Sequence, residues 1–189
     1  MAITVVDICN GALSRIGDIH IVALADSTRA AILCKRFYER TLEELLRMHD
    51  WNFAVKRRAL SQLSATIVGD EWTYHYQLPS DPWCLRVLEV LDSSNDYRIE
   101  GRELYTNDED VNLRYIARIE DVTLLDSIFV SALECRIASK LAMPLTQSKS
   151  LRDSLLLESQ MLLEKAWHTS GKERGQPVQA NTAWADVGR

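Results

Sequence analysis

The spacing of apolar residues changes twice along this chain, and that change limits the possible folds more than any other feature. Near both ends, apolar residues recur three or four positions apart, which is the spacing of one helix face. Between residues 53 and 119 they tend to alternate with polar residues, which is typical of half-buried strands. The pattern therefore predicts an α+β protein in which strands are inserted between helices.

The two helical segments together predict four helices. These helices are expected at residues 5–16, 28–49, 123–143 and 148–169. Gly17, Pro144 and Gly171 are expected to end the first, third and fourth helix, because glycine and proline favour helix ends. Asp26 or Ser27 is expected to cap the start of the second.

The third predicted helix is expected to be the most buried. It carries few charged side chains, and its apolar residues include Phe129 and Leu133. Small residues such as Ala132 should let a neighbouring helix approach closely. Apolar residues between the first two helices are expected to pack onto the helices: Ile19, Ile21, Val22 and Leu24. We predict that residues 1–52 and 120–171 form a four-helix bundle.

The inserted segment, residues 53–119, is expected to form one small antiparallel β-sheet between the second and third helices. Its strands are expected at residues 72–78, 84–91, 97–105 and 111–117. The second of these stretches is apolar on both faces, which indicates a central strand. The third is expected to be a hairpin that turns at Gly101.

Residues 172–189 have no regular pattern and are predicted to form an extended C-terminal arm. Trp184 is the kind of aromatic side chain that dominates an interface when it fills a pocket. Pro177 and Val178 favour an extended backbone before it. We predict that Pro177, Val178 and Trp184 bind a partner; the alternative is a loose tail with an incidental tryptophan.

Charge is distributed unevenly along the chain. The net charge is −5, which argues against a DNA-binding regulator, because such proteins carry a basic face. Seven acidic and two basic residues between positions 92 and 110 give a local charge of −5 as well. Asp108, Glu109 and Asp110 end this acidic segment. The basic cluster Lys56, Arg57 and Arg58 is either a polar strand face or a contact between neighbouring subunits.

The sequence contains no recognised catalytic or cofactor motif. A P-loop, a dinucleotide-binding glycine motif, a nucleophile elbow and a zinc-protease motif are all missing. The many carboxylates leave a general acid–base pair open. We predict a protein that is not an enzyme, with no catalytic residues, no cofactor and no metal site. The four cysteines are expected to be buried thiols.

Targeting signals are not evident either. The first residues lack the basic region of a secretory signal peptide. No apolar run approaches the length of about 18 residues that a membrane span needs. We therefore expect synthesis and assembly in the cytoplasm.

Two stretches of the chain together resemble a known family. The first comprises residues 9–17 and 51–54, with Leu24, Asp26, Ala31, Cys34, Tyr38 and Arg58. The second comprises residues 114–116, 132–133 and 141–146, with Phe129 and Ala138. In order and spacing they resemble the head-to-tail connector proteins of short-tailed bacteriophages, the tail tubular protein A type of adaptor. The resemblance covers most of the chain and is weakest between residues 61 and 109.

This resemblance implies a structural role at the capsid–tail junction of a virion. Such adaptors form a ring, generally a dodecamer, beneath the portal protein, where they extend the DNA channel and provide the docking surface for the tail nozzle. Genomic DNA would pass through the ring without sequence-specific binding. The arm with Pro177, Val178 and Trp184 would clasp the portal or a neighbouring subunit.

The resemblance also gives the acidic segment a place, with Asp108, Glu109 and Asp110 facing either the channel or the nozzle. An acidic lumen would not retain DNA, because proteins hold phosphates with cationic side chains. The alternative function is a virion-associated enzyme, such as a cell-wall hydrolase. A cluster of active-site residues would distinguish that enzyme from an adaptor.

Overall fold

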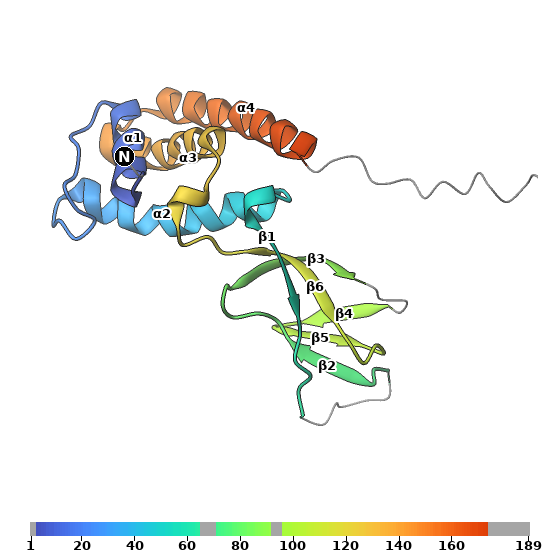
Figure 1. Ribbon diagram of the computed structural model, residues 1–189. Coiled ribbons are helices and arrows are strands. Elements are labelled where there is room, and N and C mark those ends of the chain that lie inside the picture. The colour runs from blue at the N-terminus through green and yellow to red at the C-terminus, as the bar shows by residue number, and fades with distance from the viewer. Residues whose placement is uncertain (1–2, 65–70, 92–95, 174–189) are drawn as a thin grey trace, which may run out of the picture.

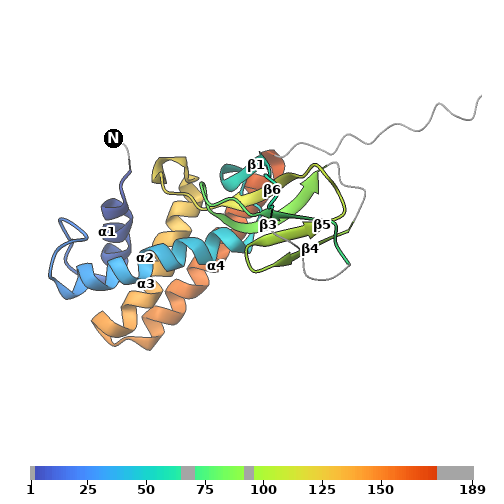
Figure 2. The same ribbon diagram turned by 90° about the horizontal axis from the view of Figure 1, so that it is seen from below.

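The structure is a computed structural model that describes residues 3–64, 71–91 and 96–173. Figure 1 shows a helical part and a strand part side by side, and Figure 2 shows the same separation from below. The helices are α1 (Val5–Ile16), α2 (Arg29–Met48), α3 (Ser127–Thr146) and α4 (Lys149–Glu173). Short 3₁₀ turns occur at η1 (Asn52–Ala54) and η2 (Val122–Leu124). The predicted α+β class is confirmed.

The strands lie between α2 and α3 in the sequence, and they form two sheets among the described residues. They are β1 (Val55–Ala59), β2 (Tyr74–Gln77), β3 (Cys84–Leu91), β4 (Tyr97–Glu100), β5 (Glu103–Thr106) and β6 (Asn112–Ala117). One antiparallel sheet has the order β1-β6-β3, and the other has the order β2-β5-β4. The prediction of a single sheet was therefore wrong.

The prediction that residues 84–91 form a central strand was also wrong. Among the described strands, β3 pairs with β6 alone and lies at one edge of its sheet, whereas β6 is central. Leu85 and Leu88 of β3 pack into the helical core, while Cys84, Val87 and Val90 pack into the core of the strand part. The apolar pattern of β3 thus reflects burial of both faces, and it gives no information about pairing at the edges.

The helix ends follow local capping chemistry. At α1, the Thr4 hydroxyl accepts a hydrogen bond from the Asp7 N–H, and the Asp7 carboxylate accepts one from the Thr4 N–H. Gly17 ends α1 in the left-handed region, with φ of 72°. The cap of α2 is Thr28, and not Asp26 or Ser27; its hydroxyl accepts from the Ala31 N–H.

Two predicted helix ends lie inside helices. α3 continues through Pro144 to Thr146, and α4 continues through Gly171 to Glu173. At α4 the reason is tertiary: Asn52 donates its backbone N–H to the Ser170 hydroxyl at 3.1 Å and its side-chain amide to the Ser170 carbonyl at 2.6 Å. These contacts hold the last turn in place and offset the low helix propensity of glycine.

The helices pack around α3, which contacts α1, α2 and α4. Phe129 and Leu133 are fully buried there, as expected for the most buried helix. Ala132 is buried too, and its carbonyl accepts a hydrogen bond from the Ser159 hydroxyl of α4 at 2.9 Å. Small side chains on both helices allow this close approach.

Candidate functional site

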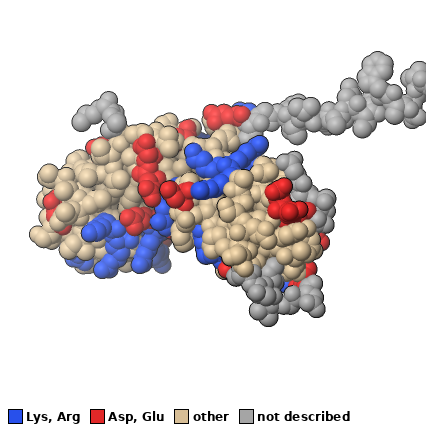
Figure 3. Space-filling model, turned by 60° about the horizontal axis from the view of Figure 1, so that its bottom comes forward, with Lys and Arg blue, Asp and Glu red and all other residues tan. Residues whose placement is uncertain are grey.

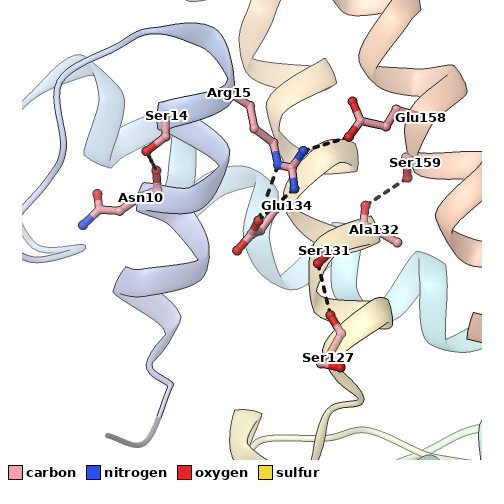
Figure 4. Close-up of polar contacts among 9 residues, drawn as sticks. All are labelled: Asn10, Ser14, Arg15, Ser127, Ser131, Ala132, Glu134, Glu158 and Ser159. Atoms are coloured by element: carbon pink, nitrogen blue, oxygen red, sulfur yellow. Dashed lines mark hydrogen bonds and ion pairs between the residues drawn. The ribbon is translucent and has the colours of Figure 1, made fainter.

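A polar contact joins α1, α3 and α4 at their common boundary (Figure 4). The Arg15 guanidinium lies 3.3 Å from the Glu134 carboxylate and 2.9 Å from the Glu158 carboxylate. A β-carbon on Gly11 would lie 2.4 Å from the Glu134 carboxylate, so a larger residue there would require the end of the Glu134 side chain to shift. Gly11 and Arg15 belong to the stretch that carries the family resemblance. The arrangement ties three helices together.

Burial raises the pKa of Glu134, and Arg15 opposes that shift by favouring the charged carboxylate. The side chain of Glu134 is one-fifth exposed, and Arg15 of α1 is its ion-pair partner among the described residues. Sequence reasoning found Arg15 and Glu134 as residues of two helices, but the pairing needed the three-dimensional structure, because 119 positions separate them.

The loop between α1 and α2, residues 17–28, is held by side-chain hydrogen bonds and is called the α1–α2 loop below. The Asn10 amide donates to the Ile21 carbonyl at 3.0 Å and accepts from the Ile21 N–H at 2.9 Å. Asp26 accepts from the N–H groups of Val22 and Ala23, and Asp18 accepts from the N–H of the following residue. Each of these bonds fixes the local backbone.

Ile19 and Val22 point into solvent from this loop, with 83% and 89% of their surface exposed. The prediction that they pack onto the helices was therefore wrong, although Ile21 is buried and Leu24 is partly buried against the core. The hydrogen bonds of the α1–α2 loop explain the difference. They orient Ile21 inward, and the residues around it, Ile19, His20 and Val22, are exposed.

A groove of about 500 Å³ lies between α2, α3 and α4, and it is called the basic groove below. Its apolar lining is Phe37, Met143 and Leu156, and its basic residues are Arg136, Lys140 and Arg152. Glu44 also lines it and accepts from Arg136 at 3.2 Å and from Lys140 at 2.6 Å. Figure 3 shows that Lys and Arg side chains gather on the helical part.

The junction between the helices and the strands is rich in arginine. Arg47 of α2 donates to the Leu85 carbonyl, and Arg86 of β3 pairs with Asp50. Arg118, just after β6, pairs with Glu43 of α2. These contacts fix the orientation of β3 and β6 against the helical part.

Arg102 anchors a second set of elements within the strand part. Its guanidinium donates to the carbonyls of Cys84, Leu78 and Pro79, at 2.8, 3.2 and 2.5 Å. It also lies 3.7 Å from the centre of the Trp83 ring, within cation–π distance. Arg102 thereby connects the β4–β5 turn to the segment between β2 and β3.

The structure brings Asp108, Glu109 and Asp110 together in the turn between β5 and β6. The Tyr76 hydroxyl donates to the backbone carbonyls of Asp108 and Glu109, and Thr106 accepts from the Asp108 N–H. Glu109 and Asp110 are exposed, while Asp108 is partly buried. The turn is therefore anchored by its backbone and presents acidic side chains outward.

Some of the predicted residues lie elsewhere or beyond the described ranges. Pro177, Val178 and Trp184 lie outside the described residues, as do positions 92–95 of the acidic segment. Lys56, Arg57 and Arg58 are exposed on β1, where Arg58 donates to the Asp81 carbonyl. The four cysteines are free and buried, as predicted: Cys9, Cys34, Cys84 and Cys135. Burial raises the pKa of Cys135 to about 12, so it is a thiol at neutral pH.

The described residues do not assemble a metal-binding cluster of three or more His, Cys, Asp or Glu side chains. In residues 3–64, 71–91 and 96–173, no helix combines the length and apolar character needed to cross a membrane. Neither a scan against protein-family models nor a search of curated proteins finds a match to this chain.

Proposed function

We propose that this chain is a non-enzymatic head-to-tail adaptor of a short-tailed bacteriophage virion. In this proposal its helices act as a four-helix bundle and its copies form a ring, dodecameric as in the family it resembles. The ring lies beneath the portal protein, extends the DNA channel and provides the docking surface for the tail nozzle. The observation that carries the proposal is that the two stretches with the family resemblance pack against one another.

Aromatic contacts join the two stretches. Trp51 and Phe53 come from the first stretch, and Phe129 comes from the second. The ring of Phe129 lies 4.9 Å from that of Trp51 and 5.1 Å from that of Phe53, both edge to face. The Trp51 indole N–H donates to the Leu45 carbonyl at 2.9 Å, which fixes the ring. Residues that carry the resemblance therefore share one core.

Gly11 and Arg15 of α1 contact Glu134 of α3. These two helices carry residues of the first and the second stretch. Specific packing of this kind favours a family relationship over chance similarity of apolar patterns. Ile19 and Val22 lie three positions apart on one fixed loop, so together they offer an exposed apolar surface that an assembling protein could use.

The acidic turn with Asp108, Glu109 and Asp110 has a defined role in this proposal. It faces the channel or the nozzle. In the channel, its charge would repel DNA phosphates. Replacement of all three residues by serine is expected to leave folding intact, because Tyr76 holds the turn through backbone carbonyls. Tail attachment or DNA passage should change; unaltered infectivity would remove this role.

Electron microscopy of negatively stained protein tests the proposal directly. The purified protein is imaged alone and after mixing with portal-bearing capsids that lack it. We expect rings, either free or seated on the portal vertex. Capsids without added density at that vertex, together with monomeric free protein, would contradict the proposal.

The arm is tested in the same binding experiment. Deletion from Gln176 onward, and separately Trp184→Ala, are expected to weaken attachment to portal-bearing capsids without changing the melting temperature. Multiplied around a ring, weak arm contacts give strong avidity, because later contacts are intramolecular. Parental affinity of the truncated protein would show that the arm is not the clasp.

A further inference from the structure

The α1–α2 loop presents two apolar side chains in an arrangement that is already fixed. Asn10, Asp18 and Asp26 hold its backbone through five hydrogen bonds to main-chain groups. Ile19 and Val22 nevertheless stand almost fully in water. A partner that covers them would bury apolar area and lose little entropy, since the loop needs no further ordering.

The loop also has a charge pattern. Asp18 lies directly before Ile19, and Asp26 accepts from the N–H of Val22, so a carboxylate lies beside each exposed apolar residue. A complementary surface must therefore combine an apolar depression with basic groups at its rim.

The basic groove on the same chain has both properties. Phe37, Met143 and Leu156 provide apolar surface, and the side chain of Met143 is exposed, at 41%. Arg136, Lys140 and Arg152 contribute three positive charges to the groove. Glu44 pairs with the first two and Asp153 pairs with Arg152 at 2.7 Å, which leaves 3 − 2 = +1. A volume of about 500 Å³ is in the range of pockets that hold small molecules, so it has room for two aliphatic side chains.

We propose that the α1–α2 loop of one copy inserts Ile19 and Val22 into the basic groove of a second copy. Asp18 and Asp26 then face the groove's basic residues. The inference rests on the proposed function only in requiring self-assembly, and it assigns the contact that mediates it. Loop and groove are different surfaces, so each copy can use both at once, and the contact is head-to-tail, as a closed ring requires.

Four variants test this contact in the full-length chain. Ile19→Ser with Val22→Ser removes the apolar contact from the loop, and Met143→Glu places a charge in the groove. The matched controls are Leu124→Ser, exposed at 51%, and Met161→Glu, exposed at 53%, which change similar residues elsewhere. All five substituted positions are at least two-fifths exposed, so folding should survive, as thermal melting and circular dichroism will check.

Sedimentation velocity over a range of concentrations gives the first readout. We expect wild-type protein and both controls to self-associate alike. The loop variant and the groove variant should each associate at least about tenfold more weakly. Equal association of the loop variant and the wild type would overturn the inference.

A mixing experiment gives the second and sharper readout. The loop variant keeps an intact groove, and the groove variant keeps an intact loop. A one-to-one mixture should therefore form one intact contact per pair, giving heterodimers that do not grow further. A mixture that stays monomeric, or that assembles as the wild type does, contradicts a loop-in-groove contact.

The two proposals fail in different ways. A wild type that assembles into rings regardless of these substitutions would leave the adaptor function standing and remove the loop-in-groove contact. A wild type that stays monomeric at every concentration also removes the contact, while binding to portal-bearing capsids decides the adaptor function separately.

Discussion

The helical part and the strand part of this protein are stabilised in different ways. The helical part has a continuous core of aliphatic and aromatic side chains that are fully buried, with Phe129 and Leu133 near its centre. The core of the strand part is small, and polar side chains such as those of Tyr76 and Arg102 bind backbone carbonyls around it. A short insert can thus hold its shape with few apolar residues, provided that its turns are anchored by side chains.

The largest expected effect is in the helical core. Leu133→Ala or Phe129→Ala should each destabilise the protein by roughly 2–5 kcal/mol, because each leaves a cavity in a fully packed site. Denaturant unfolding followed by circular dichroism measures this loss. Melting within a degree or two of the parent protein would mean that the helical part does not depend on α3 as its centre.

The next effect is expected at Arg102 in the strand part. Arg102→Met should cost about 1.5–3 kcal/mol, because three carbonyls lose a charged donor. The matched control is Arg98→Met, since Arg98 is half exposed and its contacts with described residues are surface ion pairs. Chemical denaturation of both variants checks the difference. Equal losses would show that the carbonyl contacts are not what anchors the insert.

A smaller effect is expected at Tyr76. The variant Tyr76→Phe keeps the buried ring and removes only the hydroxyl that binds the Asp108 and Glu109 carbonyls. We expect a loss of about 0.5–1.5 kcal/mol. Amide hydrogen exchange should also become faster in residues 106–111. A stable protein with unchanged exchange there would mean that the turn is held by its own backbone.

The smallest effect is a pH dependence at the start of α1. Hydrogen bonds from the Thr4 side chain and backbone lower the pKa of Asp7 below its ordinary value of 3.8. The stabilisation is therefore present above that ordinary pKa and is lost as the pH falls through the lower, folded value. Asp7→Asn should reduce stability near neutral pH and flatten its dependence between pH 5 and 2, measured by thermal melting. An unchanged profile would exclude this contribution.

The sequence predicted the bounds of helices and strands better than it predicted which of them lie side by side. The span of α1 and its end at Gly17 followed from local chemistry, and the strand at residues 84–91 has the predicted bounds. The place of that strand in the sheet did not follow, because burial on two faces looks the same for an edge strand and a central one.

Predictions about the candidate site differed in the same way. The acidic residues 108–110 are adjacent in sequence and therefore share a turn whatever the fold. The outward direction of Ile19 and Val22 depends instead on Asn10, which lies in the preceding helix. The sequence around an asparagine in a helix does not indicate which backbone groups its side chain will bind. The basic groove combines residues of three helices, so no local pattern indicates it.

The contact between Asn52 and the last turn of α4 has a mechanical consequence. Asn52 begins the 3₁₀ turn that leads directly into β1, and it is hydrogen-bonded to Ser170. Figure 1 shows that the end of α4 lies beside the start of β1. A pulling force on the chain beyond residue 173 would therefore reach the start of β1 through the hydrogen bonds between Asn52 and Ser170, without being transmitted back along α4. Any binding partner that holds that end would also restrain the start of the strand part.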